Sequence, residues 1–179
     1  MKLSFEQLIA PILALKPRGE ILLETVPAPQ KLAPHALAMT ADVLEDAATG
    51  RFVLLHDPAS QEGWGGQWRC VTFARSAIDL EMASDPLLPE IGWAWLLEAL
   101  KKNNCEFISP SGTVTRVASA SFGALADREE DSEMEIRASW TPNDGENLLS
   151  HVNAWLELLA MAAGLEPIPQ GVSSIARNS

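Results

Sequence analysis

A histidine beside an aspartate is the first pair in this chain whose types and spacing could do chemistry. His56 and Asp57 lie in LLHDPASQEGWGGQW, residues 54–68. A His-Asp doublet holds the metal of one class of phosphohydrolases, but that metal needs further histidine and aspartate ligands, and the chain has only 3 histidines. Because Asp57 can hydrogen-bond forward to the backbone and Pro58 fixes its own φ, the pair suits the start of a turn. We therefore expect the two residues to serve a turn, and we predict no metal site.

Glycines and tryptophans fill the rest of this loop. The run GWGGQW, residues 63–68, lacks the lysine of a phosphate-binding loop, and a strand rather than a helix is expected after it. Hairpin loops of this length commonly need glycine for positive φ. Trp64, at the tip, must either fold back onto the core or face a partner, and the general burial of aromatic side chains favours folding back.

Arg116 is the most unusual charge in the sequence. In TVTRVASASF, residues 113–122, it shares a strand face with Val114 and Ala118. A guanidinium on an apolar face needs a carboxylate or a bound anion to offset the loss of water. The favoured interpretation is an internal ion pair with the carboxylate of Asp79, Glu81 or Asp42.

The alternative interpretation makes Arg116 a clamp for an anionic ligand, with room left beside it by small side chains. A cleft of this kind would be lined by Arg116, Ser119, His56, Trp64 and Trp68. No catalytic set accompanies these residues, because no serine stands in a G-x-S-x-G elbow and no carboxylate pair has a diagnostic spacing. The sequence therefore points to no catalytic residue and to no cofactor.

Charge and export signals restrict the partners and the compartment. Lys and Arg number 13 and Asp and Glu 24, which gives a net charge of −11. Such a surface repels phosphate backbones and anionic lipid, so we expect no nucleic acid and no membrane partner. The N-terminus is interrupted by Glu6 and Pro11 and does not read as a signal peptide. Cys70 and Cys105 cannot make a disulfide framework. We expect a cytoplasmic protein with reduced thiols.

The elements that must position these residues follow from the hydrophobic periodicity. A helix over 3–15 has a capping box between Ser4 and Gln7, and Pro11 should kink or end it. The helix of 85–104 has little polar face, so we expect it to be heavily buried. The remaining expected elements are a strand at 20–26, a three-stranded meander over 38–45, 51–57 and 67–76 with a turn at 48–50, a hairpin of 110–125 with 132–140, and a helix of 145–164.

This order predicts an α+β fold in two layers, with the helices on one side of a mostly antiparallel sheet. Without the strand at 20–26 it reads α-β-β-β-α-β-β-α, which resembles the element order of type III secretion chaperones. That likeness of order carries no function. We expect one domain over residues 1–166 and a mobile C-terminal tail over 167–179. The helix of 145–164 has an apolar stripe wide enough to suggest a homodimer, with Leu149 and Leu158 widening it.

Five longer stretches carry a resemblance to a known family. They are VPAPQKLAP, GRFVLLHDPASQEGWGG, MASDPLLPEIGWAWLLEAL, PSGTVTRVASASFG and EIRASWTP, which together cover roughly residues 20–165. With these stretches the chain resembles an actinobacterial family catalogued as domain-of-unknown-function family 3000. The resemblance implies a bacterial, cytoplasmic protein of one domain and carries over no activity, cofactor or site residue.

The sequence leaves two classes of function open. The first is a non-enzymatic interaction module, of the chaperone or adaptor kind, which binds another protein on its sheet or helix surface. The second is a binding protein or enzyme for a small anionic ligand, with a cleft near Arg116 and the 56–68 loop. The lack of a recognisable catalytic set favours the first class.

Overall fold

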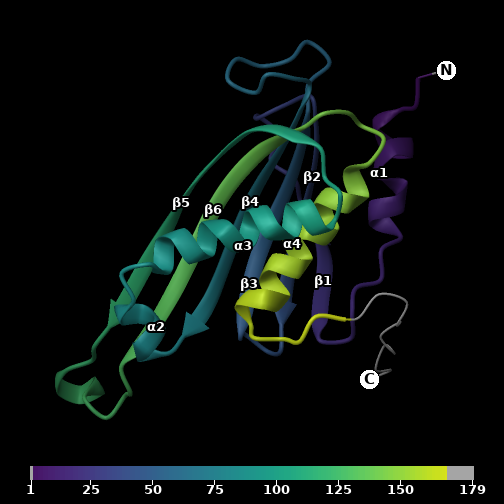
Figure 1. Ribbon diagram of the computed structural model, residues 1–179. Helices are drawn as coiled ribbons and strands as arrows, with labels where there is room; N and C mark the ends of the chain where they lie inside the picture. Colours follow the sequence, from purple (N-terminus) through teal and green to yellow (C-terminus); the bar gives the residue numbers. More distant parts are fainter. Residues whose placement is uncertain (1, 169–179) are drawn as a thin grey trace.

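A computed structural model describes residues 2–168 of the chain. It has an α+β fold in which helices pack on one face of a six-stranded antiparallel sheet, as expected from the sequence (Figure 1). Most of the predicted tail of 167–179, from residue 169 on, lies outside the described residues. The elements are α1 (Phe5–Leu13), β1 (Ile21–Val26), β2 (His35–Val43), β3 (Ala48–His56), β4 (Trp68–Ile78), α2 (Leu80–Ser84), α3 (Leu88–Lys102), β5 (Phe107–Ser119), β6 (Asp131–Pro142) and α4 (Leu148–Ala162).

The sheet has the strand order β1-β2-β3-β4-β6-β5, and every neighbouring pair is antiparallel. In Figure 1, α3 and α4 cross one face of this sheet, and the long β5–β6 hairpin extends beyond them. Alternation sends every second side chain of a strand to the helix face. Phe52 and Leu54 therefore belong to the main core, whereas Arg51 and Val53 point to the opposite face.

The turn between β2 and β3 lies earlier than the sequence indicates. The predicted turn at 48–50 is wrong, because these residues are part of β3. The chain turns instead at Leu44, Glu45 and Asp46, whose φ values are all positive, and the Asp42 carboxylate accepts a hydrogen bond from the Asp46 amide at 2.7 Å. Gly50 serves packing: a Cβ there would lie 2.7 Å from the carbonyl oxygen of Phe73 on β4.

Helix α4 supplies the centre of the core. Nine of its residues are buried, among them Trp155 and Leu158, and it contacts β2, β3 and β4 as well as α1 and α3. The indole N–H of Trp155 donates to the carbonyl oxygen of Phe73 at 3.3 Å. Since Leu158 is fully buried and Leu149 packs against the same core, the apolar stripe is used inside the subunit. It therefore no longer argues for a homodimer.

The two other main helices begin as expected and are placed by specific contacts. Helix α1 starts at the N-cap Ser4, and both hydrogen bonds of its capping box with Gln7 are present, which confirms that prediction. Helix α3 has proline in its first turn and lies over β5. Gly112 of β5 makes that approach possible, because a Cβ there would be 2.9 Å from the Trp93 ring.

Helix α3 is less buried than expected. Five of its fifteen residues are buried, while Leu97 is 37 % exposed and Trp93 is half-buried. The expectation of a heavily buried helix is therefore wrong, because α3 lies over the outer strand β5 with one side to solvent. No helix within residues 2–168 is long and apolar enough to cross a membrane.

Candidate functional site

The face of the sheet opposite α3 and α4 carries a groove across its central strands. The groove has a volume of about 540 Å³ and runs over β3, β4, β6 and β5. Its floor is apolar, and its sides bear hydroxyl and guanidinium groups. Its lining includes Arg51, Val53, Val71, Phe73, Ser111, Arg137 and Ser139.

The middle of this groove is apolar and only partly covered. Val71 of β4 is 40 % exposed, and the neighbouring Phe73 is half-buried. Towards the β3–β4 loop the same face is closed by a small second core around Val53 and Leu55, on which Trp64 and the segment after β1 pack. The apolar surface therefore continues from a buried patch into the open groove.

A buried arginine lies behind the hydroxyl groups of the groove. Arg69 is 8 % exposed, and its guanidinium donates to the Ser139 hydroxyl at 2.8 Å, the Ser109 carbonyl at 2.9 Å, the Thr141 hydroxyl at 3.0 Å and the Ser111 hydroxyl at 3.3 Å. All four acceptors are neutral. Burial lowers the pKa of Arg69 from its ordinary value, but a guanidinium stays protonated in proteins. Arg69 is thus a buried positive charge without an ion-pair partner in the described part of the chain.

Two further arginines stand at the sides of the groove. Arg137 lies over the ring of Phe73, with 5.3 Å from its Cζ to the ring centroid, and its ion pair with Glu135 is long, at 3.5 Å. Arg51 is exposed and makes no ion pair to any described carboxylate. The groove therefore combines an apolar floor with three guanidinium groups, although the whole chain has a net charge of −11.

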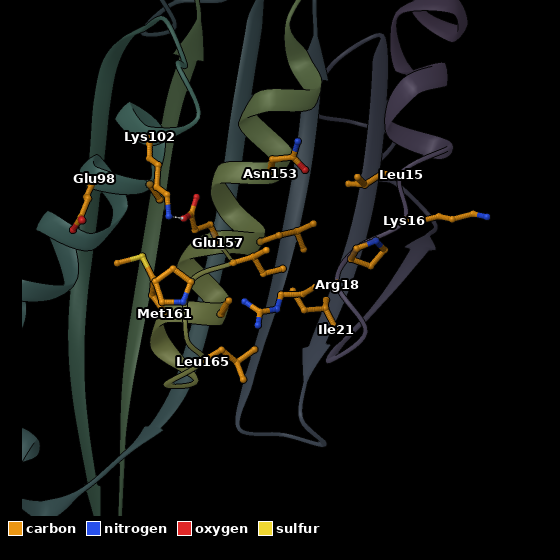
Figure 2. A pocket seen from close by; sticks show the side chains of 16 residues that line it. Leu15, Lys16, Arg18, Ile21, Glu98, Lys102, Asn153, Glu157, Met161 and Leu165 are labelled. Carbon is orange, nitrogen blue, oxygen red and sulfur yellow. Dashed lines mark ion pairs between the residues drawn. The ribbon is translucent and has the colours of Figure 1, made fainter. Parts of the chain in front are cut away.

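A second cavity lies on the helix side, between α4, α3 and the segment that joins α1 to β1 (Figure 2). Its volume is about 390 Å³. Much of its wall is apolar and is formed by Leu15, Ile21, Leu156, Ala160, Met161 and Leu165. Lys102 and Glu157 pair across it at 2.5 Å, and the Arg18 guanidinium points into it from the β1 side (Figure 2).

The residues of the 56–68 loop and its flanks make contacts that hold the loop against the rest of the protein. The Asp57 carboxylate accepts the Ala59 amide at 2.9 Å, as expected for a turn. His56 stacks on Trp68 with 4.0 Å between ring centroids, and burial lowers the pKa of His56 from its ordinary value. Trp64 folds back onto the second core, which confirms that prediction. Within residues 2–168, no three histidine, cysteine, aspartate or glutamate side chains converge as metal ligands.

Arg116 does not have the environment predicted from the sequence. It is exposed, and its guanidinium donates to the carbonyl oxygen of Asp85 at 3.0 Å. The predicted internal ion pair is wrong, because the outer strand β5 leaves the side chain in solvent beside α2 instead of inside the core. No described carboxylate pairs with Arg116.

The cleft predicted between Arg116 and the 56–68 loop does not form. The loop lies near the start of β5, where Ile108 pairs with Thr141, and Arg116 is farther along the strand by roughly 25 Å at the usual rise per residue. Ser119, three residues after Arg116, points to the other face of the sheet. The structure brings His56 and Trp68 together, and it leaves Arg116 and Ser119 apart from them.

Sequence reasoning missed Arg69 and Arg18. Alternation in QWRCVTF, residues 67–73, places Arg69 on the same face as Val71 and Phe73, so the argument applied to Arg116 would have found it. Arg18 lies in a loop between α1 and β1, and a loop has no hydrophobic periodicity from which burial could be predicted. Its position follows only from the tertiary structure.

Comparisons with known proteins identify a family and nothing more specific. A family model described as "Protein of unknown function (DUF3000)" matches residues 2–173, nearly the whole chain. No curated protein and no solved structure matches it. The match agrees with the resemblance carried by the sequence stretches.

Proposed function

Because the chain belongs to the DUF3000 family, whose description names no activity, we propose from its geometry that it is a non-enzymatic interaction module. It binds a segment of another protein in the groove on the uncovered face of its sheet. The observation that carries the proposal is the half-open apolar floor of Val71 and Phe73 between Arg51 and Arg137. Exposed apolar patches with a polar rim are typical of binding surfaces.

The charges of the groove favour an acidic partner segment. Arg51 and Arg137 stand at its sides, and Arg69 places a buried positive charge behind Ser111 and Ser139. Because the Arg69 guanidinium donates to both hydroxyl oxygens, the hydroxyl hydrogens are not needed to bind it. The two hydroxyls lie 3.3 Å apart, so one can donate to the other while the second donates to a ligand. Carboxylate oxygens accept from hydroxyls and guanidinium groups, and their charge would offset that of Arg69.

Photo-crosslinking from single positions in the native host tests where a partner binds. A photoreactive residue at Val71, 40 % exposed in the groove, is compared with one at Leu97, 37 % exposed on α3. The two positions have matched exposure on opposite sides of the sheet. We expect an adduct of defined mass from position 71 and none of that mass from position 97. Equal adducts from both positions, or none from 71, would contradict the proposal.

The same experiment identifies the kind of partner. An adduct of twice the subunit mass would show that a second copy of the chain occupies the groove. The protein would then be a homodimer through this face, and the proposal of a foreign partner segment would be wrong. An adduct with another protein supports the proposal, and its crosslinked peptide should be rich in aspartate or glutamate. A crosslinked peptide that is basic would contradict the charge argument.

A further inference from the structure

The helix-side cavity has the size and lining of a small-molecule site. Its volume of about 390 Å³ lies within the range of roughly 300–1,000 Å³ that is usual for ligand pockets. Apolar side chains from α4 and from the segment around β1 line most of it, among them Leu156, Ala160 and Leu165. In Figure 2 side chains of the cavity wall lie around a common space, into which the Arg18 guanidinium projects.

Arg18 offers this space a hydrogen bond that the protein does not use. One terminal nitrogen of its guanidinium donates to the Glu20 carboxylate at 2.8 Å, and the other donates to the carbonyl oxygen of Glu166 at 3.0 Å. The third donor, Nε, is buried and has no acceptor within residues 2–168. A buried donor left without a partner is costly, so an unsatisfied one calls for a specific explanation. An acceptor on a bound molecule would satisfy it.

The charges around the cavity are already balanced. Arg18 pairs with Glu20, and Lys102 pairs with Glu157 at 2.5 Å. Glu157 also accepts from the Asn103 amide at 2.7 Å. In Figure 2, Lys16 extends away from the other labelled side chains. Glu98, which also lines the cavity, and Lys16 are both exposed to solvent. A charged ligand would therefore meet no free opposite charge that is buried in the cavity, and burying its charge would be costly.

We infer that the helix-side cavity binds a small, uncharged and largely apolar molecule that carries a hydrogen-bond acceptor, such as a carbonyl oxygen, for Arg18 Nε. Asn153, whose side chain makes no hydrogen bond to the described part of the chain, is a second polar contact at the wall. This site is independent of the proposed protein-binding groove, because the two lie on opposite sides of the sheet.

Titration with prodan, an uncharged naphthalene ketone with an environment-sensitive fluorescence, tests the inference on the full chain. We expect one prodan to bind per subunit with blue-shifted emission. Ala160→Leu fills the cavity and should weaken binding by about tenfold or more, whereas Ala162→Leu, on the same helix but away from the cavity wall, should change it less than about twofold. Arg18→Met should weaken binding by about tenfold or more, the usual effect of losing one hydrogen bond from a charged donor.

Thermal denaturation of each variant shows whether it folds. If Ala160→Leu does not fold, Met161→Trp takes its place, because Met161 lies half-exposed at the rim and a larger side chain there narrows the cavity. The inference is overturned if prodan does not bind, or if folded cavity-filling variants bind it as well as the unchanged chain. If Val172→Asp with Ile175→Asp creates prodan binding that the unchanged chain lacks, the chain itself fills the cavity and the inference fails.

Discussion

Mild acid should destabilise the folded protein through His151. This histidine is 3 % exposed, and its Nδ1 accepts a hydrogen bond from the indole N–H of Trp140 at 2.9 Å. Burial lowers the pKa of His151 from 6.5 to about 4, and a protonated Nδ1 could no longer accept from Trp140. Folding therefore requires the neutral ring.

The sign and size of the effect follow from the two pKa values. Between pH 6.5 and about 4 the unfolded chain holds a proton on His151 that the folded chain lacks, so stability falls as the pH falls through this window. Since one pKa unit corresponds to about 1.4 kcal/mol, the full loss is roughly 3 kcal/mol, and about 2 kcal/mol of it occurs between pH 7 and pH 5.

Urea denaturation of the unchanged chain and of His151→Gln at both pH values isolates this contribution. The glutamine side-chain oxygen can still accept from Trp140, and it does not titrate. Other groups, His56 among them, titrate alike in both proteins. The stability advantage of the unchanged chain over the variant should therefore shrink by about 2 kcal/mol from pH 7 to pH 5. The same advantage at both pH values would refute the reasoning.

Two further substitutions test the fold. Arg116→Met should change the free energy of unfolding by less than about 0.5 kcal/mol, because the guanidinium is exposed and bonds to a single carbonyl oxygen. A loss of several kcal/mol in urea denaturation would contradict this and would indicate that Arg116 forms a buried ion pair. Gly112→Ala should cost about 1–3 kcal/mol, because the new Cβ would lie 2.3 Å from the carbonyl oxygen of Arg137 and 2.9 Å from Trp93. Thr115→Ala, at an exposed position of β5 whose side chain makes no hydrogen bond to the described residues, is its control, and equal stability of the two variants would contradict the close approach of α3.

The elements of the fold could be predicted from sequence because each has a local signal. The capping box at Ser4, the alternation of β6 and the stop after α4 at Gly164 all depend on residues close in sequence. The turn between β2 and β3 could not be placed, because Gly50 marks a close approach to β4, which is a tertiary contact. Helix α2 was missed because it has only five residues.

The candidate sites were harder to predict than the fold. Alternation correctly placed Arg116 on the helix face of β5, but burial there depends on how far α3 extends along the outer strand. The same alternation, had it been applied to Arg69, would have placed that side chain on the opposite face of β4, where neighbouring strands bury it. Sequence gives the direction of a strand side chain, and its burial is set by the strand's position in the sheet. The order of strands is therefore the information that was missing.

Charge reversal at the groove tests the central claim most directly. A photoreactive residue at Val71 is combined with Arg51→Glu, at the side of the groove, or with Arg116→Glu, an exposed arginine on the other face. Both changes alter the net charge equally. If an acidic segment binds the uncovered face of the sheet, the adduct from position 71 should be lost with Arg51→Glu and retained with Arg116→Glu. An adduct that survives Arg51→Glu, or that both substitutions reduce equally, would contradict the account.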